Sequence, residues 1–107
     1  MISLINGTVR SLTSDRAIVE VGGVGLSITI TPGTSALLNI GASAQFYTCL
    51  VVREESLTLF GFLDDEVRAL FELVQTVSGI GPKVAMSIVA ALSPSQLGLA
   101  VAQEDIS

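Results

Sequence analysis

The apolar residues of this chain follow two different periods, and the change falls near residue 64. In residues 24–31 apolar side chains alternate with glycine, serine or threonine, a period of two that is typical of a half-buried strand. Four further apolar runs bounded by turn-forming residues also indicate strands, and they cover residues 2–9, 17–21, 45–52 and 57–62. The first part of the chain is therefore predicted to be β.

Five short strands predict a small barrel. Residues 34–39 lie between the third and fourth predicted strands and have room for one or two helical turns. This order of elements matches a five-stranded OB-fold barrel of the Greek-key type. A five-stranded SH3-like barrel is the main alternative, and alternation alone does not separate the two.

From Asp64 onward the apolar period is helical. A first helix is predicted from the spacing of Val67, Leu70, Phe71, Val74 and Val77. The three acidic residues 64–66 suit the start of this helix, because its dipole favours negative charge there. Residues 78–81 contain two glycines and are predicted to end it.

A second helix is predicted from Pro82, which is well suited to a first helical position. We predict that its buried stripe consists of Val84, Ile88 and Leu92. Residues 93–96 resemble a capping box and predict a third helix after them.

Together these patterns predict an α+β fold with two parts. Residues 1–63 are expected to form the barrel domain, and residues 64–107 a helical domain. The chain stops after an acidic segment without a helix-ending signal, which indicates a fragment of a longer protein.

Composition excludes several kinds of chemistry. The chain has no histidine, one cysteine and no GxxxxGK[ST] segment, so histidine-based catalysis, a zinc cluster and a Walker-type nucleotide site are not expected. No apolar run approaches the ~20 residues that span a bilayer, and the N-terminus lacks the basic start of a signal peptide. We therefore expect a cytoplasmic protein, without a cofactor, that is not an enzyme. Cys49 lies in an apolar run and is expected to be a small buried side chain.

The segment between the two main helices carries a more specific signal. From Val74 to Ile88 the sequence follows the helix-hairpin-helix pattern, apolar-x-x-apolar-x-Gly-apolar-Gly-x-x-x-Ala-x-x-apolar. Its glycines permit a positive φ, Ile80 is expected to point inward, and Ala85 to keep the helices close. Backbone N–H groups at the start of the second helix can then bind a phosphate. The expected phosphate-binding residues are Gly79, Gly81, Lys83 and Val84, and the alternative is a helical corner without a ligand.

The formal net charge of −5 does not exclude nucleic acid. Residues 1–63 have three cations against four carboxylates, and residues 64–107 have two cations against six. Most of those six lie at the start of the first helix or at the chain end, away from the glycine turn. One turn with one lysine binds weakly, since affinity grows with the number of phosphates neutralised, so several copies are expected to act together.

Glu54 and Glu55 are adjacent acids where the fourth predicted strand turns into the fifth. They have three interpretations: a solvated hairpin tip, a nuclease site with Mg²⁺, or a repulsive element that faces phosphates. The nuclease interpretation is weak, because two adjacent carboxylates rarely complete a metal site.

Four segments in order, MI…GTV, IVEVGGVG, VVREESLTLFGF and SGIGPKVA, resemble the RuvA family of Holliday-junction-binding proteins. The resemblance implies an OB-fold barrel and a homotetramer, single or paired face to face, that holds an open four-way DNA junction. It implies phosphate contacts at Gly79, Gly81 and Lys83, and it assigns Glu54 and Glu55 to an acidic pin at the junction centre. It also implies a separate ATPase, RuvB, and a resolving nuclease, RuvC, as partners.

The chain departs from the family pattern in two respects. A second helix-hairpin-helix, a linker and a C-terminal helical domain are not found in it, and its pin reads Glu-Glu where Glu-Asp is common. We therefore expect weaker junction binding than for an intact subunit, and no recruitment of the motor. The alternative function is a general module for DNA or protein binding. Binding to single strands is disfavoured, because the chain has five aromatic residues, most in core-like runs.

Overall fold

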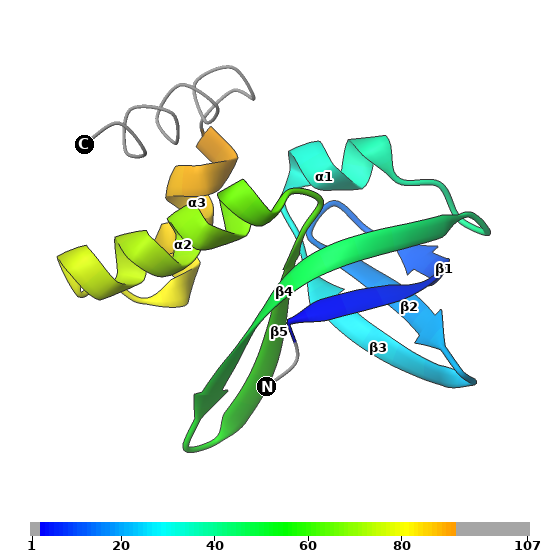
Figure 1. Ribbon diagram of the computed structural model, residues 1–107, viewed down its shortest axis with the longest axis horizontal. Helices are drawn as coiled ribbons and strands as arrows, with labels where there is room; N and C mark the ends of the chain where they lie inside the picture. The colour runs from blue at the N-terminus through cyan, green and yellow to red at the C-terminus, as the bar shows by residue number, and fades with distance from the viewer. Residues whose placement is uncertain (1–2, 92–107) are drawn as a thin grey trace.

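The computed structural model describes residues 3–91, which form a five-stranded barrel and a pair of helices beside it (Figure 1). The strands are β1 (Leu4–Leu12), β2 (Arg16–Val21), β3 (Val24–Thr29), β4 (Ser43–Arg53) and β5 (Ser56–Phe62). The helices are α1 (Pro32–Leu37), α2 (Asp65–Ser78) and α3 (Pro82–Ala91). All five predicted strands and both predicted main helices are present, with bounds shifted by a few residues.

The sheet closes in the order β1-β2-β3-β5-β4, with β4 pairing back to β1. Neighbouring strands are antiparallel except β3 and β5, which pair in parallel. Helix α1 connects β3 to β4 and lies at one end of the barrel (Figure 1). This arrangement confirms the predicted OB-fold barrel.

The barrel interior is filled by alternate side chains of all five strands. Its buried cluster consists of Ile5, Ala17, Val19, Ile28, Ile30, Phe46 and Leu59. Gly61 also faces this interior, where an added Cβ would collide with the Ile28 side chain. Because the Ile28 and Phe46 side chains fill the space beside Gly61, a larger residue here would displace them.

Helix α2 has the termini that its sequence predicts. The Asp64 carboxylate accepts a hydrogen bond from the N–H of Glu66 at 2.9 Å and caps the first turn. At the other end Gly79 adopts φ 68°, and its N–H donates to the Gln75 carbonyl. The left-handed conformation suits glycine and ends the helix directly before the turn.

A second apolar cluster joins the outer face of β4 and β5 to the two helices. Phe71 is completely buried, and its ring centroid lies 5.1 Å from those of Phe60 and of Phe62. Cys49 belongs to this cluster and is buried, as predicted. Residues 59–62 of β5 are thus covered on both faces, which explains why this half of the strand is continuously apolar.

The predicted buried stripe of α3 is wrong. Val84 and Ile88 are 52% and 40% exposed, whereas the helix buries Pro82, Ala85, Met86 and Val89. Both sets have helical spacing. The second set is buried because the small side chain of Ala85 lets that face of α3 lie close to α2. Leu92 and the capping pattern at residues 93–96 lie outside the described residues.

The described residues contain one helix pair and a turn, not a complete helix-hairpin-helix domain. The proposed boundary after residue 63 stays a prediction, since the second apolar cluster joins barrel and helices. Within residues 3–91, no helix is long and apolar enough to cross a membrane.

Candidate nucleic-acid interface

The turn between α2 and α3 presents backbone donors at the start of α3. The Gly81 carbonyl accepts from the N–H of Ala85 at 3.1 Å, which begins the helical hydrogen-bond pattern. The first N–H groups of a helix have no acceptor within it, and Pro82 has no N–H. The N–H groups of Lys83 and Val84 are therefore the donors that α3 leaves for a ligand, and both residues are exposed.

The two glycines of this turn have different roles. Of the two, Gly79 adopts the positive φ that glycine permits, and Gly81 does not. A Cβ added at Gly81 would lie 3.5 Å from a guanidinium nitrogen, Nη2, of Arg53, which is an ordinary contact distance. The last side chain of β4 thus lies against the turn.

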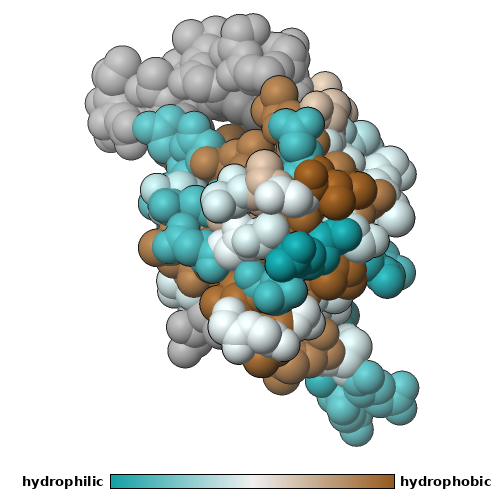
Figure 2. Space-filling model, turned by 90° about the vertical axis from the view of Figure 1, so that its right-hand side faces the viewer, coloured by the Kyte–Doolittle hydropathy of each residue, from teal (hydrophilic) through white to brown (hydrophobic). Residues whose placement is uncertain are grey.

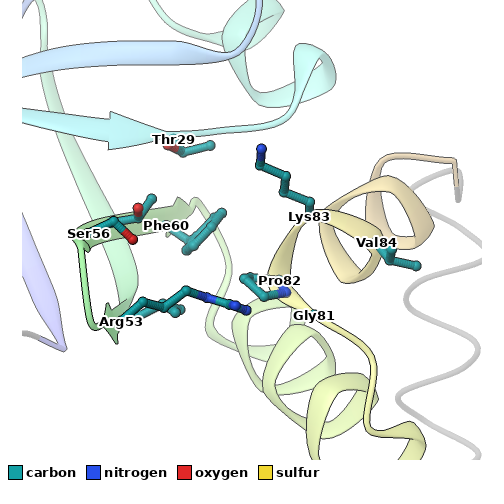
Figure 3. A pocket seen from close by; sticks show the side chains of 10 residues that line it. Thr29, Arg53, Ser56, Phe60, Gly81, Pro82, Lys83 and Val84 are labelled. Carbon is teal, nitrogen blue, oxygen red and sulfur yellow. The ribbon is translucent and has the colours of Figure 1, made fainter.

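Arg53 is a candidate site residue that the sequence reasoning missed. It lies almost thirty positions before the turn, and only the packing of the β4–β5 hairpin beside the helices brings the two together. Its side chain extends toward Gly81 and Pro82 (Figure 3). The signal available in the sequence was a cation that directly precedes the acidic pair.

Arg53 and Lys83 line the same groove, of about 550 Å³, between the barrel and the turn. Its other lining residues are Thr29, Val51, Ser56, Thr58, Phe60, Gly81, Pro82 and Val84. The lining contains two cations and three hydroxyl groups, and none of these residues is acidic. Lys83 extends from α3 toward Thr29, while Val84 points away from Lys83 and the groove centre (Figure 3). The Val84 side chain therefore contributes little to the groove, although its N–H belongs to the turn.

The two cations of the groove differ from others in the described part of the chain. Arg10 pairs with Glu20 at 3.0 Å, and Arg68 pairs with Asp65 and Glu72 at 2.6 and 2.8 Å. Within residues 3–91, neither Arg53 nor Lys83 has a carboxylate partner. Their charge is thus available to an anion from solution.

Glu54 and Glu55 occupy the tip of the β4–β5 hairpin, between the paired residues Arg53 and Ser56. Both are exposed, and the tip lies at the far end of the longest hairpin from the helices (Figure 1). Figure 2 shows a hydrophilic projection at the same lower end of the molecule. The tip can therefore present negative charge to a partner without contact from the rest of the described chain.

Other sites considered from the sequence find no support. Within residues 3–91, no three His, Cys, Asp or Glu residues are grouped so that they could hold a metal ion. Four of the five aromatic residues, Phe46, Phe60, Phe62 and Phe71, are buried in the two clusters. They are unavailable for stacking with bases, whereas the groove offers backbone and cationic donors.

The sequence model of the RuvA N terminal domain matches residues 1–61, which is the barrel. The chain belongs to the RuvA family. It is 51% identical to a protein of Acidothermus cellulolyticus over 106 aligned residues. The aligned segment covers 99% of this chain and 54% of that protein. The chain is 50% identical to proteins of Nocardioides sp. and Streptomyces coelicolor, which it covers to 53% and 52%.

All three relatives carry the name Holliday junction branch migration complex subunit RuvA. The chain spans about half the length of these RuvA proteins. The match to the RuvA N terminal domain ends before α2. The similarity of α2, α3 and the turn between them to the RuvA family is therefore shown by the alignment with the longer relatives.

Proposed function

We propose that this chain is a non-catalytic, junction-binding part of a RuvA-type subunit, active in recombination and repair in the bacterial cytoplasm. One observation carries the proposal: the donors at the start of α3 share a carboxylate-free groove with two unpaired cations. Such a groove suits a phosphodiester backbone, and relatives named as Holliday junction subunits supply the kind of DNA.

In this proposal the turn holds DNA without reading its sequence. The N–H groups of Lys83 and Val84 donate to phosphate oxygens, the Lys83 side chain adds a positive charge, and Gly79 and Gly81 shape the backbone. Such contacts fix the position of a duplex arm relative to the protein, whatever its bases. One copy makes few contacts, so a homotetramer, single or paired, supplies one turn for each arm.

The acidic hairpin tip acts by repulsion. Glu54 and Glu55 are exposed and project from the barrel, so four copies around a symmetry axis bring eight carboxylates near the junction centre. Phosphates are repelled there, which keeps the junction open and separates the strands that exchange. Energy for movement comes from a separate ATPase subunit, RuvB, and RuvC is the nuclease partner.

Binding to three DNA forms tests this function. The chain is titrated into a four-way junction, a duplex and a single strand of equal length, at two salt concentrations and without Mg²⁺. We expect the junction to bind most tightly and all affinities to fall with salt, because phosphate contacts release counterions. Equal affinity for all three forms would favour the alternative, a general DNA- or protein-binding module. Cleavage of the junction after addition of Mg²⁺ would instead support the nuclease interpretation.

A further inference from the structure

We infer that Arg53 is a phosphate ligand and a positioning residue, which ties the bound DNA strand to the acidic hairpin. The inference deepens the proposed function and rests on it for the identity of the DNA. Two distant segments meet here: the guanidinium of Arg53, at the end of β4, lies against Gly81 of the α2–α3 turn (Figure 3).

The charge of Arg53 has no partner within the described residues, although Glu54 and Glu55 follow it directly. An ion pair with either acid would have drawn the guanidinium to the hairpin tip. Instead the side chain turns toward the helices and lines the groove together with Lys83. A cation oriented away from adjacent carboxylates and into a carboxylate-free groove is well placed for an external anion.

The groove provides donors from several directions. Arg53 comes from β4, Lys83 from the start of α3, and the hydroxyl groups of Thr29, Ser56 and Thr58 come from β3 and β5. A tetrahedral phosphate can accept hydrogen bonds from several sides, whereas a planar carboxylate accepts mainly within one plane. The planar fork of a guanidinium also matches two phosphate oxygens. The expected ligand is therefore one phosphodiester group of the DNA backbone.

The floor of the groove strengthens this binding. Val51 and Phe60 line it, and Phe60 is buried against the helices. Apolar walls lower the local dielectric, so the attraction between a phosphate and two cations is larger than on an open surface. A phosphate bound here contacts the hairpin and the helix pair together.

The cation that attracts the DNA backbone, Arg53, is thus next in sequence to the acidic tip that repels it, Glu54 and Glu55. A strand held at Arg53 is fixed relative to Glu54, the next residue along the hairpin. We expect Arg53 to determine where the strand meets the acidic tip, and Lys83 to act as a general cation.

The test compares Arg53→Gln with Arg16→Gln, a matched loss of one exposed arginine that lies outside the groove and has no ion pair within residues 3–91. Affinity for a four-way junction is measured by fluorescence anisotropy over a range of salt concentrations. We expect Arg53→Gln to weaken binding roughly tenfold and to lower the slope of log affinity against log salt by about 1. Arg16→Gln should change the affinity and the salt slope less. Arg53→Lys keeps the charge, so it should weaken binding without changing the salt slope. Equal behaviour of Arg53→Gln and Arg16→Gln would overturn the inference.

The outcomes separate this inference from the proposed function. If the unchanged chain shows no preference for junction over duplex, the proposed function fails, and the salt slopes on duplex still test Arg53. An unchanged slope with altered self-association of Arg53→Gln in sedimentation velocity would mean that the groove receives an acidic segment of a second copy. That result would contradict the DNA ligand.

A measurement on the unchanged chain covers the case in which the variants fold poorly. Inorganic phosphate is added while the arginine Nε–Hε and backbone amide signals are followed by NMR. We expect the signals of Arg53 and of the Lys83 and Val84 amides to shift together. Shifts of the amides without a shift of Arg53 would show that the arginine is not a ligand.

Discussion

The base and the tip of the β4–β5 hairpin have opposite characters. At the base, Cys49, Phe60 and Phe62 lie beneath α2 and α3 and are almost completely buried. At the tip, Glu54 and Glu55 are exposed and form the turn between the paired residues Arg53 and Ser56. One continuous hairpin thus carries a rigid apolar contact at one end and a charged projection at the other.

The difference indicates how the site is built. The base determines where the helix turn lies relative to the barrel, because the aromatic cluster packs both together. The tip contributes charge without contributing to that packing. Changes at the base should therefore affect stability and DNA binding together, and changes at the tip should affect DNA behaviour alone.

Removing the central ring of the base should have the largest effect. Phe71 is completely buried between Phe60 and Phe62, so Phe71→Ala leaves a cavity and should cost about 3–5 kcal/mol of unfolding free energy. Urea unfolding measures this loss. Phe71→Leu is the control and should cost less, because it fills most of the space. A loss below about 1 kcal/mol for Phe71→Ala would show that the helices are not held by this cluster.

Raising the pH should destabilise the buried end of the β4–β5 hairpin and leave its acidic tip unchanged. Burial, together with the neighbouring Glu72, raises the pKa of the Cys49 thiol from 9.0 to about 11, so folding favours the neutral thiol. This contribution is complete below pH 9 and is lost as the pH rises through 11; the shift corresponds to on the order of 2–3 kcal/mol. Unfolding free energies from pH 8 to 11 measure it. In Cys49→Ala this part of the pH dependence should disappear, and an identical dependence in both proteins would contradict it.

The two glycines of the turn should respond differently to alanine. Gly79→Ala places a side chain at φ 68° and should cost roughly 1–2 kcal/mol, with weaker junction binding because the donors of α3 move. Gly81→Ala needs no positive φ and places its Cβ at an ordinary contact distance from Arg53, so its stability should be nearly unchanged. Thermal unfolding and junction titration of both variants check this. Equal destabilisation would show that the left-handed turn at Gly79 is not the critical feature.

Neutralising the tip should have the smallest effect on stability. Glu54→Gln with Glu55→Gln removes two exposed charges without packing partners, and we expect a change within about 0.5 kcal/mol. Junction affinity should stay the same or increase, since the repulsion between carboxylates and phosphates is lost. Fluorescence anisotropy with a four-way junction measures this. A large loss of affinity would contradict a repulsive role for the tip.

Much of the fold could be predicted from local patterns. Alternation in residues 24–31 and four bounded apolar runs located the five strands, and the acidic residues 64–66 and the glycine-containing residues 78–81 marked the two ends of α2. These features depend on neighbouring residues, since capping, left-handed glycine and side-chain period act over a few positions. The turn motif was likewise readable, because its donors and glycines are close together in the sequence.

The buried face of α3 and the place of Arg53 could not be predicted in this way. Two apolar stripes of α3 have equally good helical spacing, and only packing against α2 and the apolar cluster of β4 and β5 buries the one that contains Ala85 and Met86. Arg53 has acidic neighbours in the sequence, yet in space it lies beside Gly81.

Local patterns along the chain thus define the elements, the barrel, the glycine turn and the acidic tip. Contacts between distant segments select the buried face of α3 and the cation that accompanies the turn. Strand period and helix caps are local properties, whereas the groove forms where β4, β5 and α3 meet. That meeting depends on the packing of Phe71, on α2, against Phe60 and Phe62 of β5, which no single segment of the sequence encodes.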